Sequence, residues 1–238
     1  MNTYRIADLS VSYDAVFPTL QTRSEKYSAP FDPQAINLAV TSEEIAQIRD
    51  STPLLTDDLR EYMILGRKFY EELIRFGGMM LHASAVVVDN QAFLFSAPSG
   101  TGKSTHTGLW LQKFGERAYI LNDDKPALRM VGETVYTYGT PFSGKFDISR
   151  NAAVPRAGIA FVERSETNSI EPLDKKRALF ELLNQTVRPQ ELLLYKQLLQ
   201  NLDQLLPRID VYRLHCNMNP EAATISYKAM RKGTDHEN

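Results

Sequence analysis

The segment that constrains this chain most is residues 95–105, which read Phe-Ser-Ala-Pro-Ser-Gly-Thr-Gly-Lys-Ser-Thr. An apolar run at 93–95 leads into it, and a helical pattern through Leu109, Trp110 and Phe114 follows it. A strand, a glycine-rich loop and a helix start, in that order, form the setting in which such a segment binds phosphate. The pattern therefore predicts a phosphate-binding loop, or P-loop, inside an α/β fold.

Each residue type in this loop has a chemical reason. Gly100 and Gly102 let the backbone curl until successive N–H groups point at one phosphate, and the helix start adds a partial positive charge. Lys103 would reach the β- and γ-phosphates, and the Ser104 hydroxyl would bind Mg²⁺. Ala97 stands where the pattern usually has its first glycine, and a Gly/Ser turn that arose by chance is the alternative interpretation. The residues predicted to bind the nucleotide are Ser99, Gly100, Thr101, Gly102, Lys103, Ser104 and Thr105.

Composition narrows the class of protein. The 238 residues are 43% hydrophobic and 24% charged, which is typical of a globular protein with one sizeable core. A net charge of −2 without a basic stripe argues against a nucleic-acid partner. No apolar run approaches the roughly 20 residues of a membrane span, and the first residues lack the pattern of a secretory signal. Cys216 is the single cysteine, so neither a disulfide framework nor a cysteine metal site is expected. We expect a cytoplasmic protein without a membrane partner.

We expect three parts along the chain. Residues 1–55 read as a small β-rich appendage, either a lip that binds a substrate or partner or a cover for one sheet edge. Residues 56–232 form the core with its C-terminal helices, and residues 233–238 form a disordered tail. The strand candidates of the appendage are Tyr4–Ser10, Leu20–Tyr27 and Ile36–Thr41.

The core combines strands with amphipathic helices. Thr56 precedes a helix whose apolar residues recur at i, i+3, i+4 and i+7 between Leu59 and Leu73, and Gly77-Gly78 end it. The later leucine-rich helices can pack on the sheet or form a homo-oligomer interface. Further strands are expected at 118–121, 127–130, 134–138, 159–162 and 209–214, and helices at 173–184, 190–206 and 221–231. The predicted fold class is α/β, with a mixed, hairpin-containing sheet flanked by helices around the P-loop.

A hairpin directly before the P-loop makes a geometric prediction. Met79–Val88 and Gln91–Ser96 read as strands joined by a two-residue turn at Asp89-Asn90. Counting back from the turn sets His82 opposite Ala97, and neighbours in such a ladder lie about 5 Å apart. His82 would then lie at the entry of the P-loop, where it could hydrogen-bond a phosphate or influence a neighbouring acid. A half-buried structural histidine is the alternative.

Two adjacent acids follow the strand at 118–121. Asn122-Asp123-Asp124 places two carboxylates at a strand end, an arrangement that is costly unless something compensates the charge. A Mg²⁺-nucleotide would compensate it, and phosphoryl transfer also needs a group that accepts the proton of the attacking hydroxyl. We assign Asp123 as the base and Asp124 as the metal ligand, although the pattern also allows the reverse. The alternative is a polar turn that happens to carry two acids.

A second Gly/Pro/Ser loop spans residues 139–145 and ends in a lysine. Lys145 could reach the transferring phosphoryl group and stabilise the charge that builds there, with Arg150 as a companion. The alternative is a turn with a solvated lysine. Glu163 reads as a surface acid and His106 as a solvated side chain in the first turn of the P-loop helix.

Three segments together resemble the HPr serine kinase/phosphorylase family, which shares its P-loop architecture with phosphoenolpyruvate carboxykinase. They are Leu81–Ala85, Ser96–Thr105 and Asn122–Asp124, and the resemblance covers roughly residues 79–165. It implies an ATP-dependent kinase that uses Mg²⁺ and phosphorylates a hydroxyl. The family's active-site positions correspond to His82, Lys103, Ser104, Asp123 and Asp124. The segment ahead of the core and the C-terminal region do not match the family, so the chain is more similar to small HPr-kinase-like proteins.

The sequence thus predicts an ATP- and Mg²⁺-dependent kinase that transfers the γ-phosphoryl group to a hydroxyl, with a serine of a peptide or protein as the preferred acceptor. Two alternatives stay open. One is a small-molecule kinase that phosphorylates free serine or a similar alcohol. The other is a non-catalytic module in which nucleotide controls docking to a partner, although such a module would not need the Asp123-Asp124 pair. The predicted catalytic residues are Asp123, His82, Lys103 and Lys145, with Ser104 and Asp124 on the metal.

Overall fold

The computed structural model describes residues 2–98 and 100–232. Two predictions lie outside these residues, namely nucleotide binding by Ser99 and disorder of residues 233–238. Within the described part, no helix is both long and apolar enough to span a bilayer.

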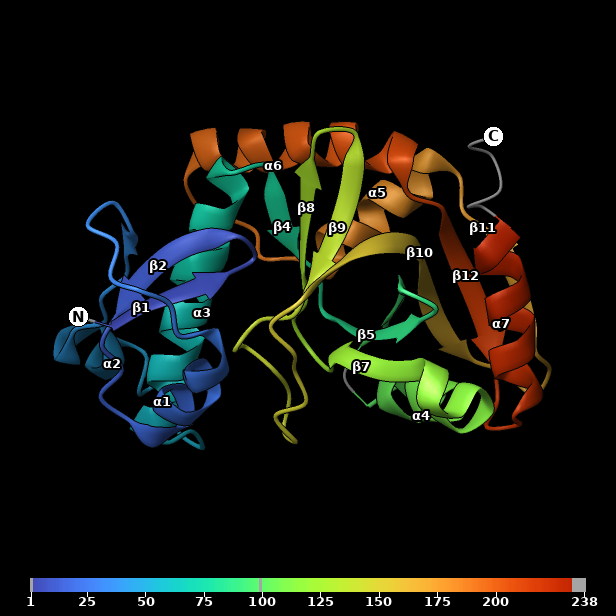
Figure 1. The fold of residues 1–238 in the computed structure, drawn as a ribbon, viewed down its shortest axis with the longest axis horizontal. Coiled ribbons are helices and arrows are strands. Elements are labelled where there is room, and N and C mark those ends of the chain that lie inside the picture. Colours follow the sequence, from blue (N-terminus) through green and yellow to red (C-terminus); the bar gives the residue numbers. More distant parts are fainter. Residues whose placement is uncertain (1, 99, 233–238) are drawn as a thin grey trace.

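The N-terminal residues fold into a small sheet with short helices. Strands β1 (Asn2–Ile6) and β2 (Leu9–Tyr13) form an antiparallel hairpin, and the two-residue β3 (Ile36–Asn37) pairs with β2 in parallel. Helices α1 (Pro18–Ser24) and α2 (Ser42–Gln47) flank this sheet, with a 3₁₀ turn η1 at Glu25–Tyr27. Figure 1 shows the unit beside the long helix α3 (Asp57–Arg75).

Two strand predictions in this region are wrong. The segment 4–10 is a hairpin rather than one strand, because Ala7 and Asp8 adopt positive φ angles of 51° and 59° that reverse the chain. The segment 20–27 is helical rather than extended. Pro18 stands at the start of α1, where its fixed φ suits a helix and its missing N–H costs nothing.

Helix α3 is confirmed, with both ends explained by the sequence. The Thr56 hydroxyl caps its start by accepting from the Leu59 N–H, and Gly77, with φ of 72°, follows its end. The buried face includes Tyr62, Phe69 and Leu73. This helix packs between the N-terminal sheet and the start of the large sheet.

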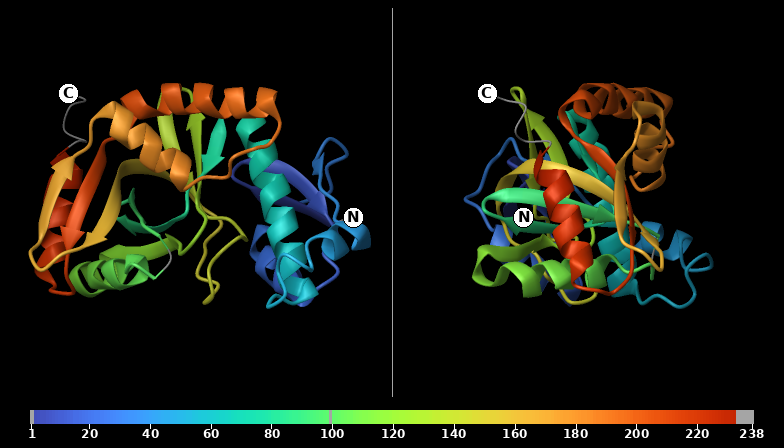
Figure 2. Two further views of the ribbon diagram at one scale, coloured as in Figure 1. Left: turned by 180° about the vertical axis from the view of Figure 1, so that it is seen from behind. Right: turned by 90° about the vertical axis from the view of Figure 1, so that its right-hand side faces the viewer.

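In the part of the chain that the structure describes, the large sheet has nine strands of mixed direction and curls around its long central strand (Figures 1 and 2). Strand β10 (Ala153–Arg164) pairs with β9 antiparallel near its start and with β6 and β12 in parallel farther on. The path along the sheet is β4-β8-β9-β10-β6-β5-β7, with β12 joined to β10 and β11 joined to β12. The remaining strands are β4 (Gly78–Met80), β5 (Ala83–Val88), β6 (Gln91–Ser96), β7 (Ala118–Asn122), β8 (Ala127–Val131), β9 (Thr134–Tyr138), β11 (Ser169–Pro172) and β12 (Val211–Cys216).

The predicted hairpin before the loop is confirmed between β5 and β6. Their register runs from Val88 opposite Gln91 to Ala83 opposite Ser96, across a turn in which Asp89 and Asn90 both have positive φ. The expected single strand 79–88 is, however, two strands that belong to different parts of the sheet. The chain breaks at Leu81 and His82, where the Leu81 N–H donates to the Pro126 carbonyl and the His82 N–H to the Gln185 carbonyl.

Helices cover both faces of this sheet. Helices α4 (Lys103–Phe114) and α7 (Glu221–Lys232) cover one face, and α5 (Lys175–Asn184) and α6 (Leu192–Leu205) cover the other. Successive residues of β5 alternate between the two cores, with Val86 and Val88 facing α4 and Ala85 and Val87 facing α5 and α6. Two 3₁₀ turns complete the fold, η2 (Gly115–Arg117) and η3 (Leu206–Arg208). The predicted mixed α/β sheet flanked by helices is therefore confirmed.

Candidate active site

The glycine-rich loop connects β6 to the start of α4. Gly100 and Gly102 have φ angles of 79° and 123°, which only glycine adopts without strain. Gly102 precedes the first turn of α4, and no side chain among residues 2–98 and 100–232 caps that turn by a hydrogen bond. The first amides of the helix are therefore open to an anion, and the helix dipole favours one there. Ser104 and Thr105 are exposed on this first turn.

Lys103 points back toward the sheet instead of into solvent. Its Nζ donates to the Ala97 carbonyl at 2.7 Å and lies 3.2 Å from Nε2 of His82. Burial lowers the pKa of Lys103, the nearby charge of Lys125 lowers it further, and Asp124 opposes both. The structure thus brings the predicted loop lysine and the predicted histidine into direct contact.

His82 is the centre of this cluster. Its Nδ1 lies 3.0 Å from the Gln185 Oε1, and because an amide oxygen only accepts, Nδ1 carries the hydrogen. Its Nε2 lies 3.2 Å from the Asp124 Oδ1 as well as 3.2 Å from Lys103 Nζ. Neutral His82 would accept from Lys103 at Nε2, whereas protonated His82 would donate to Asp124. The imidazole therefore couples the lysine and the aspartate through one nitrogen.

The acidic pair is held by the buried side chain of Asn122. Its Oδ1 accepts from the N–H groups of Asp124 and Lys125, at 3.0 and 2.8 Å, and its Nδ2 donates to the Thr140 carbonyl at 3.0 Å. These bonds tie the turn at the end of β7 to the loop after β9. The backbone position of Asp124 therefore depends on one amide side chain, whereas the N–H of Asp123 donates to the Ile148 carbonyl.

The two aspartates have opposite electrostatic environments. Burial alone would raise the pKa of Asp124, but the hydrogen bond from His82 and the adjacent Lys125 ammonium outweigh it and bring this pKa to about 2. Burial raises the pKa of Asp123, and the charge of Asp124 adds to this, although the Gly144 N–H donates to its Oδ1 at 2.6 Å. Asp124 is thus held as an anion, while Asp123 is the carboxyl whose proton affinity is increased, as a general base requires.

The loop at 139–152 covers Asp123. Gly139 opens it at a position where a Cβ would lie 1.9 Å from the Arg150 carbonyl oxygen, so only glycine fits. Lys145 is exposed, with its Nζ 5.9 Å from the centre of the Phe146 ring. Within residues 2–98 and 100–232, neither a hydrogen bond nor an ion pair joins Lys145 to Asp123 or Asp124. Arg150 stacks on the Tyr119 ring at 4.1 Å.

Several contacts at the site come from residues that the sequence did not single out. Arg23 of α1 donates to the carbonyls of Ser143 and Gly144 at 2.8 and 3.1 Å, and the Tyr62 hydroxyl donates to the same Ser143 carbonyl. The N-terminal segment thus fixes the loop that contacts Asp123. No local pattern marks Arg23, since the loop that it contacts is more than a hundred residues away in the chain.

The structure also describes the surroundings of His106 and Glu163. The prediction that His106 is a solvated side chain is wrong. His106 belongs to α4 and is buried against α7, where its Nε2 contacts Trp110 and Ser226. Glu163 lies at the end of β10 and pairs with Arg213 and His215. Both residues have structural partners of their own.

The oxygen donors near the loop suit a magnesium ion that arrives with phosphates. Mg²⁺ is commonly held by one or two carboxylates together with phosphate oxygens. Here the donors are the exposed Ser104 hydroxyl and the carboxylates of Asp123 and Asp124. Among the described residues, no three His, Cys, Asp or Glu side chains gather into a metal site of their own. The donor set fits a metal that nucleotide phosphates help to bind.

Comparison with known proteins identifies the family of this chain but does not establish its activity. No curated protein matches the chain. The HPr(Ser) kinase/phosphatase from Coxiella burnetii aligns with it at 14% identity, covering 65% of this chain and 98% of that one. The TM-score is 0.34, which does not establish a shared fold. The family model described as "SynChlorMet cassette protein ScmC" matches residues 59–225, a segment that contains His82, Lys103 and both aspartates. The chain belongs to the ScmC family.

Proposed function

We propose that this protein is an ATP- and Mg²⁺-dependent kinase that transfers the γ-phosphoryl group to a hydroxyl, with a serine of a peptide or protein as acceptor. The observation that carries the proposal is the continuous contact Lys103–His82–Asp124 beside the glycine-rich loop, at 3.2 Å for each step. A turn with structural roles alone would not need a lysine, a histidine and an aspartate in contact beside such a loop, with a second aspartate next to them. Phosphoryl transfer uses these groups together.

In this proposal, the loop holds the triphosphate. The amides of Gly100 and of residues 102–104 would donate to the phosphate oxygens, since the Thr101 N–H already donates to the Pro98 carbonyl. Lys103 would move from the Ala97 carbonyl and His82 onto the β- and γ-phosphates. Once Lys103 leaves, Nε2 of His82 loses the ammonium from which it accepts, and a protonated imidazole would donate from Nε2 to a phosphoryl oxygen or to Asp124. His82 therefore links nucleotide binding to the acidic pair.

Asp123 is the proposed base. It lies next to the anionic Asp124, and its raised pKa favours proton transfer from an acceptor hydroxyl. The Gly144 N–H fixes one of its oxygens, which leaves the other for that hydroxyl. Ser104 and Asp124 would hold the magnesium ion, which would neutralise charge on the β- and γ-phosphates.

Lys145 would need to move before it could take its proposed role. It neighbours Gly144, whose amide contacts Asp123, but its ammonium points toward Phe146. A change in this loop on acceptor binding would be needed to bring Lys145 to the transferred group. Its contribution is therefore expected to appear in transfer and not in nucleotide binding.

The surface beside Asp123 supports a peptide or protein acceptor. Phe146 and Ile148 on the 139–152 loop have exposed fractions of 75% and 43%. The backbone of Ile148 accepts from the Asp123 N–H, so this apolar surface adjoins the proposed base. A closed pocket for free serine would be expected to bury such side chains.

Transfer of label from [γ-³²P]ATP with Mg²⁺ tests the proposal. The acceptors are water, free serine, serine-containing peptides and HPr, and wild type is compared with Lys103→Met and with the exposed control Lys113→Met. We expect label on a peptide, lost in Lys103→Met and kept in Lys113→Met. Label on free serine alone would identify a small-molecule kinase, and ATP binding without label on any acceptor would favour the non-catalytic module.

A further inference from the structure

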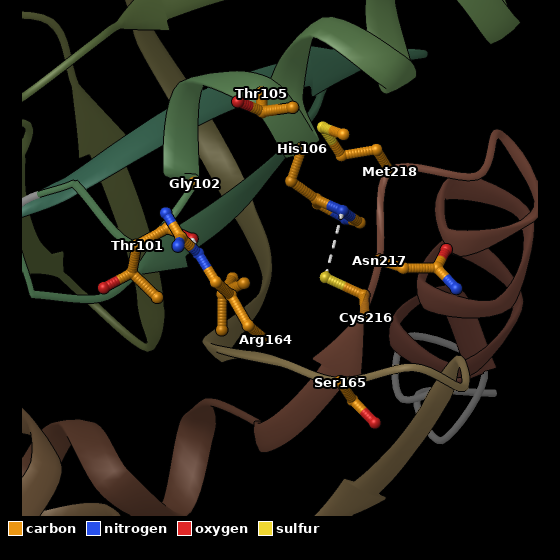
Figure 3. Close-up of a pocket in the computed structure, with 10 residues that line it drawn as sticks. Thr101, Gly102, Thr105, His106, Arg164, Ser165, Cys216, Asn217 and Met218 are labelled. Carbon is orange, nitrogen blue, oxygen red and sulfur yellow. Dashed lines mark hydrogen bonds between the residues drawn. The ribbon is translucent and has the colours of Figure 1, made fainter.

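A cavity of about 410 Å³ adjoins the phosphate loop on the α4 side of the sheet. It is lined by the loop and the first turn of α4, the end of β10, and the connection from β12 to α7, and it opens to solvent. Figure 3 shows Thr101, Gly102 and Arg164 on one side, with His106 and Cys216 across from them. The proposed catalytic groups His82, Asp123 and Asp124 do not line this cavity.

The inner wall of the cavity is apolar and uncharged. Val162 and Cys216 are buried there, and His106 is exposed by only 2%. Burial lowers the pKa of His106 to about 4, so the imidazole is neutral at physiological pH. Its Nε2 contacts Trp110 and Ser226, and its Nδ1 lies 3.8 Å from the Cys216 thiol. This wall suits a flat uncharged ring and not a phosphate.

The rim next to the loop carries a planar cation. Arg164 donates from Nε to the Thr101 carbonyl at 3.0 Å and from its terminal nitrogen to the Gly100 carbonyl at 2.5 Å. The guanidinium is thereby fixed between the loop and the cavity, where it can stack on an aromatic ring. Met218, exposed by 77%, lies at another part of the rim.

We propose that this cavity binds the purine base and ribose of the nucleotide whose phosphates occupy the glycine-rich loop. The inference rests on the proposed function and adds the position of the nucleoside. The volume of the cavity lies within the roughly 300–1,000 Å³ that is typical of small-molecule binding sites. Thr101 and Gly102 belong both to the loop and to the cavity wall, so one ligand can occupy both spaces. The base would lie against Cys216 and His106 and beneath the Arg164 guanidinium.

The single cysteine allows a direct test of this position. Cys216 is the chain's one thiol and lines the cavity, so its modification by N-ethylmaleimide reports on this site alone. Modification is measured with Mg-ATP and with Mg-tripolyphosphate, which lacks the nucleoside. Their concentrations are matched to give equal thermal stabilisation, because binding alone slows labelling that depends on opening of the fold. We expect ATP to slow modification at least tenfold more than tripolyphosphate, and equal protection would overturn the inference.

Photolabelling with 8-azido-ATP gives a second, independent readout. We expect the label on peptides that contain Thr105, Val162 or residues 216–218, and we expect an excess of unlabelled ATP to prevent it. Specific labelling elsewhere would overturn the cavity assignment while leaving ATP binding, and with it the proposed function, intact. Failure of both ATP and tripolyphosphate to bind would instead contradict the proposed function, and the cavity assignment with it.

Discussion

The two adjacent aspartates should respond in opposite directions when their charge is removed. Asp124→Asn removes a carboxylate that interacts with His82 and Lys125 and whose side chain is 23% exposed. Its pKa falls from 3.8 to about 2, and each pKa unit corresponds to about 1.4 kcal/mol, so the ionised group contributes about 2.5 kcal/mol to stability. We therefore expect Asp124→Asn to lower Tm by about 5–10 °C at pH 7.

Asp123→Asn should be neutral or stabilising. Because its pKa is raised, ionised Asp123 costs stability above the pKa of the unfolded chain, and an asparagine avoids this cost. The amide oxygen of the asparagine can still accept from the Gly144 N–H. The aspartate that we assign as the base is thus expected to be held at the expense of stability.

Urea denaturation of wild type and both variants between pH 2 and 7 measures these effects. The stabilising contribution of Asp124 is fully present above pH 3.8 and is lost as the pH falls toward 2, so Asp124→Asn and wild type should converge there. The penalty from Asp123 should develop as the pH rises above 3.8. An Asp124→Asn variant as stable as wild type, or an equal loss in both variants at pH 7, would refute the electrostatic assignment.

Three further predictions follow from single side chains. Asn122→Ala should lower the free energy of unfolding, measured by urea denaturation, by about 2–4 kcal/mol, because its buried partners lose their hydrogen bonds. The exposed control Asn151→Ala should change it by less than about 0.5 kcal/mol, and equal losses in the two variants would contradict this. Arg23→Met removes a positive charge that lowers the pKa of Asp123, so the acidic limb of the transfer pH–rate profile should move to higher pH, and an unmoved limb would count against the assigned base. Wild type should lose up to about 3 kcal/mol of unfolding free energy as the pH falls from 6.5 to 4, because His106 binds a proton in the unfolded chain before it does so in the folded one. His106→Gln should lack this loss, and the same pH dependence of stability in wild type and variant would show that His106 is not buried neutral.

The elements with local signals could be predicted from the sequence. The register of β5 and β6 follows from the two-residue turn at Asp89 and Asn90, because loop length fixes which residues face each other. Helix α3 follows from its apolar spacing and from the Thr56 cap. The contact between His82 and Lys103 is the consequence of this register, since β5 begins one residue after His82 and β6 leads into the loop.

The wrong predictions concern segments whose conformation depends on contacts with residues that are distant in the sequence. The chain breaks at Leu81 and His82 because their amides bond to Pro126 and Gln185, neither of which is near them in the sequence. His106 is buried because α7, more than a hundred residues away, supplies Ser226 as its partner. The segment 20–27 has apolar spacing that also fits a strand, and Pro18 was the missed helix signal.

The central claim is that Asp123 deprotonates an acceptor while the loop and Lys103 hold ATP. The most direct measurement is the single-turnover rate of γ-phosphoryl transfer to the labelled acceptor for wild type, Asp123→Asn and the exposed control Asp50→Asn, with ATP affinity determined in parallel. We predict that Asp123→Asn binds ATP nearly as wild type does but transfers about 10²–10⁴-fold more slowly, with Asp50→Asn unchanged. Near-normal transfer by a folded, ATP-binding Asp123→Asn variant would contradict the account.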